Sequence, residues 1–71
     1  MKRLSFIAKP NNSENEYLVI NSRGEVHCRF KYKDFSYYID PPLMAAHSAI
    51  FVSELLNLES EKEHNKLFPN A

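Results

Sequence analysis

The stretch EVHCRFKY, residues 25–32, alternates polar and apolar side chains at every position. Successive side chains of a β-strand point to opposite faces, so this pattern predicts a strand with one buried face and one wet face. The apolar set comprises Val26, Cys28, Phe30 and Tyr32, and the polar set comprises Glu25, His27, Arg29 and Lys31. The function of the polar set is the main question that the sequence raises.

The residues before this strand predict two more strands. EYLVIN, residues 16–21, is apolar and β-branched, and the loop at 22–24 that follows it contains the only glycine of the chain. Glycine tolerates the positive φ that the last position of a three-residue hairpin loop needs. RLSFIA, residues 3–8, also has strand composition, and the polar segment KPNNSEN at 9–15 predicts a loop.

The residues after the strand predict a tight turn and a fourth strand. Lys33 and Asp34 are expected to form the turn, although they lack the glycine that a two-residue turn prefers. FSYYI, residues 35–39, has the aromatic and β-branched composition of a strand. The short connections predict that all the strands are antiparallel neighbours.

The sequence also predicts one C-terminal helix. Asp40 suits the N-cap, and Pro41 suits the first helical position, where its missing N–H costs nothing. No helix breaker follows until Pro69, so the helix is expected over 41–58, with 59–71 either continuing it or forming a frayed tail. The expected fold class is therefore α+β: an antiparallel β-meander of three to four strands with one C-terminal helix packed on one face.

The expected register leaves one face of the sheet open. The loop at 22–24 places Leu18 opposite Cys28 and Ile20 opposite Val26, all on the apolar face that the helix covers. The open face is then expected to carry six candidate partner-binding residues: Tyr17, Val19, His27, Arg29, Lys31 and Tyr38.

The sequence allows three interpretations of this open face. A row Tyr17–Arg29–Tyr38 has the composition of protein-interface hot spots, so another protein is the first expected partner. Aromatic and basic side chains on an open sheet also suit single-stranded nucleic acid, which is the alternative. A formal net charge of zero disfavours that alternative, because phosphate contacts supply most of the affinity of nucleic-acid-binding proteins. The third interpretation is a solvated face without a partner.

The expected helix has more apolar surface than one sheet face requires. The arc expected to face the sheet comprises Met44, Ala45, Ala49, Phe51, Val52, Leu55 and Leu56. Three further apolar residues lie on the polar side around His47. The sequence therefore predicts a homodimer interface at Leu43, Ala46, His47 and Ile50, or else cover for these residues from the first strand or the tail.

Charge is distributed unevenly along the chain. Residues 1–33 hold seven basic and three acidic residues, a net charge of +4, whereas residues 34–71 hold two basic and six acidic residues, a net charge of −4. Such asymmetry indicates either a polar partner surface or attraction between the two halves.

No residue spacing predicts an enzyme, a metal site or a cofactor. His27, His47 and His64 lie far apart, and the chain offers one cysteine, so no zinc pattern is present. His27 and Cys28 are adjacent in a strand and are expected to point to opposite faces, which prevents a nucleophile–base pair. We therefore expect a protein without catalytic activity.

The size and composition of the chain indicate its class and its location in the cell. Its 71 residues allow one small domain, which buries only roughly 60% of its unfolded surface and so benefits from association. A single thiol, no recognisable signal peptide and no apolar run long enough for a bilayer predict a cytoplasmic protein without a membrane partner. Chains of this kind commonly act as regulators, inhibitors or adaptors, and many are encoded by phages and mobile elements.

Overall fold

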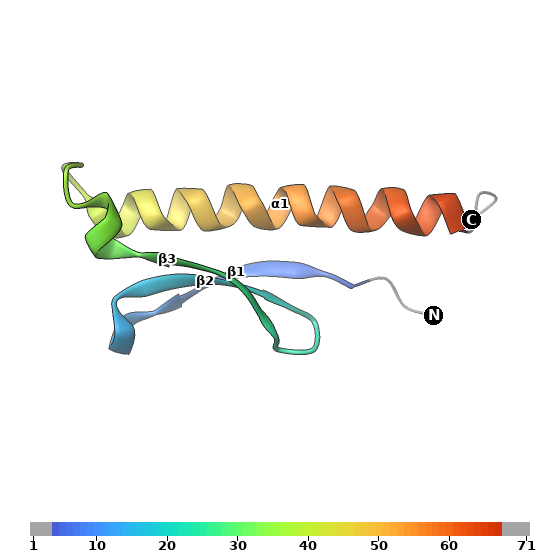
Figure 1. Cartoon of the computed structure of the whole chain (residues 1–71), viewed down its shortest axis with the longest axis horizontal. Coiled ribbons are helices and arrows are strands. Elements are labelled where there is room, and N and C mark those ends of the chain that lie inside the picture. The colour runs from blue at the N-terminus through green and yellow to red at the C-terminus, as the bar shows by residue number, and fades with distance from the viewer. Residues whose placement is uncertain (1–3, 68–71) are drawn as a thin grey trace.

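The computed structural model describes residues 4–67 and confirms the α+β class, with a three-stranded antiparallel sheet and one long helix packed on one face (Figure 1). Arg3 of the expected first strand and residues 68–71 of the expected tail lie outside the described residues. The elements in chain order are β1 (Phe6–Asn11), the 3-10 helix η1 (Asn12–Glu14), β2 (Glu16–Asn21), β3 (Val26–Lys31), the 3-10 helix η2 (Tyr32–Phe35) and α1 (Pro41–Leu67).

β1 starts and ends three residues later than the sequence suggests. Its pairing with β2 runs from Phe6 opposite Asn21 to Asn11 opposite Glu16. Pro10 lies within it, which is tolerated because β1 is an edge strand and one side of its backbone needs no partner. The chain then reverses at Asn15, whose φ of 52° is left-handed, a conformation that asparagine adopts more readily than most residues.

The β2–β3 hairpin is organised by Asn21. Its buried side-chain oxygen Oδ1 accepts the backbone N–H groups of Arg23 and Glu25 at 2.9 and 3.0 Å. Gly24 has a φ of 83°, so the expected role of this glycine in the hairpin loop is confirmed. The expected pairing of Ile20 with Val26 is also present.

Beyond this first pair the register differs from the expected one because β3 contains a β-bulge. Val19 lies opposite Cys28 while Ile20 lies opposite Val26, so His27 is an extra residue without a direct partner on β2. Leu18 therefore pairs with Arg29 rather than with Cys28. This shift reverses the expected orientation of every side chain of β2 relative to the helix.

The expected turn at Lys33–Asp34 and the expected strand at 35–39 are wrong. Residues Tyr32–Phe35 form η2, and the segment after it continues without strand pairing to the start of α1. A two-residue hairpin needs positive φ at its turn, and neither Lys33 nor Asp34 adopts such a conformation readily. The sheet consequently has three strands, the lower end of the expected range.

α1 begins where the sequence predicts and runs further. The carboxylate of Asp40 accepts the backbone N–H of Leu43 at 3.3 Å, which confirms its N-cap role. The helix spans 27 residues and includes 59–67, so the described part of the expected tail is helical. At 1.5 Å per residue it measures about 40 Å, twice the length of a six-residue strand, and its last turns extend past the sheet (Figure 1).

The most deeply buried residues of the helix are small, and Val52 and Leu56 pack against the core beside them. Ala45, Ala49 and Ser53, spaced four residues apart, are buried against the sheet. They allow α1 to approach closely, and Val19 at the centre of the sheet is fully buried beneath it. In the described part of the chain the buried hydrophobic residues number four: Phe6, Val19, Ala45 and Ala49. Such a small core gives little stability to an isolated copy.

Candidate functional site

The structure separates the six residues that the sequence assigns to the open face. Val19 is 0% exposed, and Tyr17 packs against the core on the helix side of the sheet. Tyr38 lies in the segment between η2 and α1, outside the sheet. The expected row Tyr17–Arg29–Tyr38 is therefore wrong, and Arg29 and Lys31 remain as the two residues that reach the open face.

His27 is displaced by the bulge. Its ring meets the edge of Phe6 with centroids 4.9 Å apart, and its Nε2 lies 3.1 Å from Nδ2 of Asn21. These contacts place His27 with the hairpin and the first residue of β1, away from Arg29 and Lys31. The contacts of His27 therefore join the hairpin to the start of β1.

The observed register defines the open face as three rows that each cross three strands. Ile7, Ile20 and Val26 form an aliphatic row. The next row is Lys9–Leu18–Arg29, and the last is Asn11–Glu16–Lys31. These nine residues constitute the open face.

The aliphatic row is substantially exposed to solvent. Ile7 is 57% exposed and Val26 is 43% exposed, at the two edges of the sheet, and Ile20 between them is half-buried. Leu18 in the adjacent row is half-buried as well. Together these four residues make a contiguous apolar area on the side of the sheet that α1 does not cover.

The opposite end of the open face contains a buried carboxylate. Glu16 is 3% exposed, and its Oε2 accepts hydrogen bonds from Nδ2 of Asn11 at 2.9 Å and from the Arg29 guanidinium at 2.6 Å. The Arg29 side chain itself remains 54% exposed. A buried charge needs such partners, so the network fixes the guanidinium in place while leaving part of it accessible.

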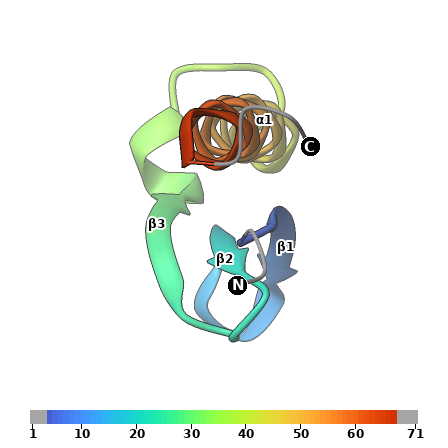
Figure 2. The same cartoon turned by 90° about the vertical axis from the view of Figure 1, so that its right-hand side faces the viewer.

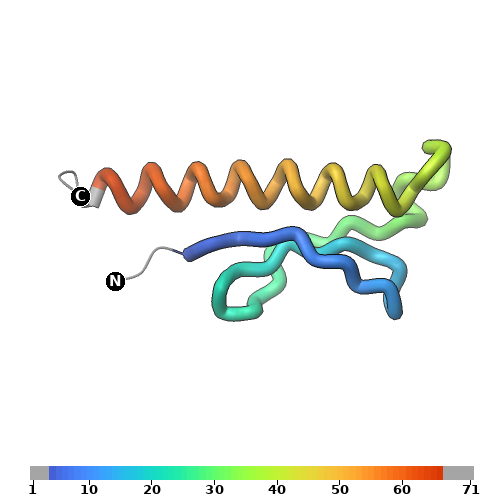
Figure 3. Tube along the Cα trace, turned by 180° about the vertical axis from the view of Figure 1, so that it is seen from behind, coloured from blue at the N-terminus to red at the C-terminus, as the bar shows by residue number. Residues whose placement is uncertain are grey.

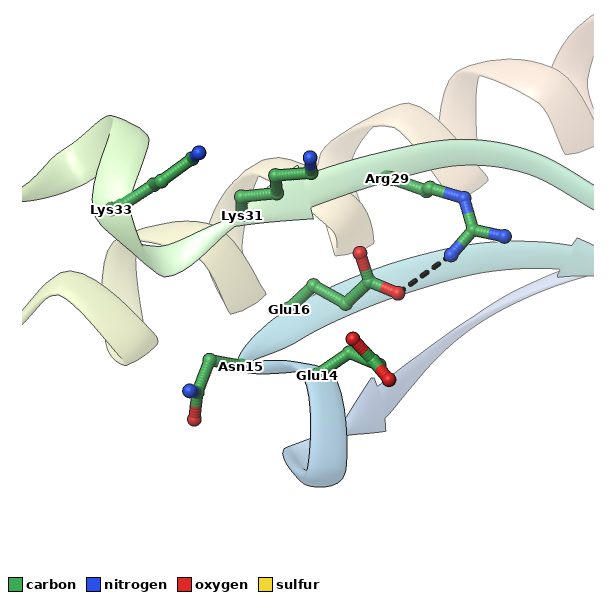
Figure 4. A pocket seen from close by; sticks show the side chains of 6 residues that line it. All are labelled: Glu14, Asn15, Glu16, Arg29, Lys31 and Lys33. Atoms are coloured by element: carbon green, nitrogen blue, oxygen red, sulfur yellow. Dashed lines mark hydrogen bonds and ion pairs between the residues drawn. The ribbon is translucent and has the colours of Figure 1, made fainter.

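Beside this network lies a shallow hollow of about 720 Å³, lined by Glu14, Asn15, Glu16, Arg29, Lys31 and Lys33 (Figure 4). Figure 4 shows the Arg29–Glu16 ion pair along one side of it, with the two lysines on the neighbouring β3 and η2 backbone. Within residues 4–67, neither the Lys31 nor the Lys33 side chain makes a hydrogen bond or an ion pair. The hollow thus presents two unpaired ammonium groups to solvent.

The four residues expected at a dimer interface lie on α1 with mixed exposure. Leu43 and Ile50 are 49% and 45% exposed, His47 is exposed, and Ala46 is half-buried. Phe51 and Leu55, which the sequence predicts to face the sheet, are instead exposed at 62% and 46%. Val52 and Leu56 pack against the core as the sequence predicts, whereas Phe51 and Leu55 point away from it.

A cluster of aromatic rings lies near the start of α1. The ring of Tyr38 lies 4.6 Å from that of Tyr37 and 6.2 Å from that of Phe35, measured between centroids. A side-chain hydrogen bond with Tyr38, together with repulsion between the two ionised phenols, raises the pKa of Tyr37. Tyr37 is 79% exposed, so this cluster is a surface feature.

Other classes of site receive no support from the described residues. Among residues 4–67, no three His, Cys, Asp or Glu side chains gather closely enough to hold a metal ion. In the same part of the chain, no helix has both the length and the hydropathy needed to cross a membrane. No protein-family model, curated protein or solved structure matches the chain.

Sequence reasoning misses all four members of the apolar area of the open face, and it assigns no face to Ile7. It places Leu18 and Ile20 inside because EYLVIN is apolar at four successive positions and gives no alternation to orient it. It places Val26 inside because regular alternation would put Val26 and Cys28 on the same face, whereas the bulge at His27 puts them on opposite faces. A polar residue at the end of a strand normally indicates which face is exposed to solvent. EYLVIN has one at each end, Glu16 and Asn21, but both are buried in hydrogen-bonded networks and so do not indicate the exposed face.

Proposed function

We propose that this chain is a small non-enzymatic binding protein, of the regulator, inhibitor or adaptor type, that contacts another protein through the open face. The observation that carries the proposal is the exposed aliphatic row Ile7–Ile20–Val26 beside a row that contains Lys9 and Arg29. A cytoplasmic location is part of the proposal, since its one cysteine, Cys28, is a free thiol.

The chemistry of the open face suggests the chemistry of its partner. An apolar centre that loses water on contact supplies the favourable free energy of association. The cations Lys9, Lys31 and Lys33 at one end favour carboxylates on the partner and speed up encounter. The expected partner is a protein surface with an apolar centre and an acidic rim on one side.

The partner is expected to contact the face of the sheet rather than its free edge. β3 is an edge strand, and an edge can pair with a strand of another chain. Here β3 carries a bulge at His27 and charged residues at Arg29 and Lys31, two features that hinder pairing along an edge. The open face has neither obstacle at its aliphatic row.

Single-stranded nucleic acid is the alternative partner, and it has less support. Sequence-tolerant binding of unpaired bases relies on aromatic side chains on which the bases stack. The nine residues of the open face include no aromatic side chain. The remaining support is the group of cations around the hollow, and nucleic-acid binding through them alone would weaken steeply as salt rises.

The proposal is tested by capture from host lysate on the immobilised protein, with and without nuclease. The informative bait is the variant Ile7→Glu, which puts a charge in the aliphatic row at an exposed edge position. The matched control is Ile39→Glu, which makes the same change at a fully exposed residue outside the sheet. Circular dichroism verifies that both variants are folded.

Support for the proposal requires one protein that survives nuclease, is captured by the wild type and by Ile39→Glu, and is lost with Ile7→Glu. Capture that is equal on all three baits would contradict it. Capture that disappears with nuclease would favour the nucleic-acid alternative.

A further inference from the structure

The surface of α1 that faces away from the sheet is unusually apolar. Its large side chains, all between 45% and 62% exposed, are Leu43, Ile50, Phe51, Leu55 and Leu58. Two polar residues, His47 and Glu54, lie among them and are exposed. These seven residues are called the outer stripe. Figure 2 shows the sheet on one side of α1 only, with the segment between η2 and α1 curving over the start of the helix, and the apolar residues of the outer stripe remain exposed.

Apart from Val52 and Leu56, which pack against the core, the helix buries small residues and exposes large ones, the reverse of what an isolated helix-on-sheet domain needs. Ala45, Ala49 and Ser53 face the sheet, while Phe51 and Leu58 face solvent. Single exposed apolar residues are common, but five on one stripe of one helix are a contiguous patch. Such patches mark contacts with another macromolecule.

We propose that the outer stripe is the interface with a second copy of this chain, and that the two α1 helices pack antiparallel about a two-fold axis between Ile50 and Phe51. The resulting dimer has four layers: sheet, helix, helix, sheet. The proposal is independent of the proposed function. α1 and the sheet form two layers (Figure 1), and the outer stripe and the open face are the outward surfaces of these two layers.

The outer stripe is complementary to itself under this two-fold rotation. Leu43 and Leu58 are equally distant from the midpoint of the stripe, so each lies at the level of the other in the second copy. Phe51 of both copies meets at the centre. His47 and Glu54 are also equidistant from the midpoint, so each His47 faces a Glu54 carboxylate of the second copy.

These two polar residues select the antiparallel arrangement. Within residues 4–67 neither the His47 nor the Glu54 side chain makes a hydrogen bond or an ion pair, and two helical turns separate the two, too far for a contact within one helix. In the antiparallel dimer each histidine N–H donates to a carboxylate. In a parallel dimer Glu54 would face Glu54, and like charges at an interface oppose association.

The size of the outer stripe suits a helix–helix contact. From Leu43 to Leu58 it extends about 22 Å along the helix. Its five half-exposed side chains present on the order of 400 Å² of apolar surface per copy, about half of the roughly 800 Å² that each partner buries in a standard interface. A central apolar area surrounded by polar contacts of similar extent is the usual composition of such an interface.

Charge also indicates why the outer stripe pairs with itself while the open face does not. The open face carries Lys9, Arg29 and Lys31 against the single carboxylate of Glu16, so two copies of it would repel. Packing of the outer stripe of one copy on the open face of another would not close, because the two surfaces point in opposite directions. A two-fold helix contact closes after two copies.

The first test measures the mass of the full chain in solution by sedimentation equilibrium, at concentrations between about 1 and 200 µM. This range brackets the roughly micromolar dissociation constant expected of a contact this small. The wild type is expected to dimerise within this range. Phe51→Glu places two carboxylates together at the axis and is expected to raise the dimer dissociation constant at least about 100-fold. Ile7→Glu, the same kind of change on the open face, is expected to leave it unchanged.

The second test is a charge exchange that identifies the orientation of the helices. It uses His47 and Glu54, which are exposed, so the substitutions are expected to leave folding unchanged. His47→Glu and Glu54→Lys are each expected to weaken the dimer about tenfold or more. The double variant restores attraction in the antiparallel dimer, because the carboxylate introduced at position 47 then faces the ammonium group introduced at position 54 of the second copy. Its dissociation constant is expected within about threefold of wild type.

The outcomes separate this inference from the proposed function. A wild type that stays monomeric at the highest concentration, or a Phe51→Glu variant that dimerises as wild type does, would overturn the inference and leave the open-face proposal unaffected. Single variants that weaken the dimer without rescue in the double variant would overturn the antiparallel arrangement. Loss of capture with Ile7→Glu would be expected whether or not the chain is dimeric.

Discussion

The side-chain amide of Asn57 makes two hydrogen bonds with the backbone of Phe6. The Phe6 N–H donates to Oδ1 at 2.8 Å, and Nδ2 donates to the Phe6 carbonyl at 3.0 Å. Ser60 adds a third bond, from its hydroxyl to the Leu4 carbonyl at 2.9 Å. Figure 3 shows the start of β1 beneath the second half of α1, where these bonds occur. They cover part of the free edge of β1 and fix the rotation of α1 about its own axis, which directs Phe51 and Leu58 outward.

Asn57→Ala is therefore expected to lower the free energy of unfolding by about 2–3 kcal/mol, because two hydrogen bonds are lost and the backbone groups of the buried Phe6 are left without these partners. Urea denaturation at fixed protein concentration measures the change. The control is Asn65→Ala, the same substitution at an exposed position of the same helix, with an expected change below about 0.5 kcal/mol. Equal effects at the two positions would contradict the role assigned to Asn57.

The observed register gives a second prediction, for two neighbouring residues of β2. Val19 is buried and Leu18 lies on the open face, the reverse of what the sequence predicts. Val19→Ala removes methyl groups from the fully buried centre of the sheet and is expected to cost about 2 kcal/mol of stability. Leu18→Ala, on the half-buried open face, removes a larger group and is expected to cost less, about 1 kcal/mol. Thermal or urea unfolding of both variants measures the two losses of stability. A larger loss for Leu18→Ala would mean that the bulge at His27 is absent.

The ion pair between Glu16 and Arg29 gives a third prediction. Arg29→Ala leaves the buried Glu16 carboxylate with one fewer donor, so stability is expected to fall by about 1–2 kcal/mol, a modest value because the guanidinium is largely exposed. Adding Glu16→Gln removes the buried charge and is expected to recover part of that loss. A double-mutant cycle by urea denaturation measures the coupling. Strictly additive losses would show that the two side chains do not interact.

The same variant connects stability with binding. If Arg29 acts only within the Glu16 network, Arg29→Ala changes stability and leaves partner affinity unchanged. If its exposed part also contacts the partner, affinity falls and depends less on salt. Lys31→Ala is the companion variant. The Lys31 side chain makes no hydrogen bond or ion pair among residues 4–67, so its loss is expected to affect partner binding without affecting stability.

Local sequence signals predict the start of α1 and the loop of the β2–β3 hairpin correctly. Asp40 and Pro41 mark the start of α1, and Gly24 marks the hairpin loop, because each supplies a backbone requirement that few other residues meet. Asp40 caps the helix, and Gly24 has the positive φ, as expected. The fold class follows from these local signals together with strand and helix periodicity.

The orientation of the faces could not be read in the same way. EYLVIN has no alternation, so its facing depends entirely on its pairing with β3, and one extra residue at His27 inverts it. FSYYI has strand composition, but strand composition reports suitability for a half-buried surface rather than actual pairing. On α1, a wheel of apolar residues could not show that the sheet selects the small ones, which depends on how closely helix and sheet approach.

The most direct test of the open-face proposal is the affinity of the captured partner for three forms of the protein, measured by isothermal titration calorimetry at one salt concentration. The forms are wild type, Ile7→Glu in the aliphatic row of the open face, and Ile39→Glu outside the sheet. We expect Ile7→Glu to bind at least about tenfold more weakly than wild type, and Ile39→Glu to bind with the same affinity. Equal affinities for all three forms would show that the open face is not where the partner binds.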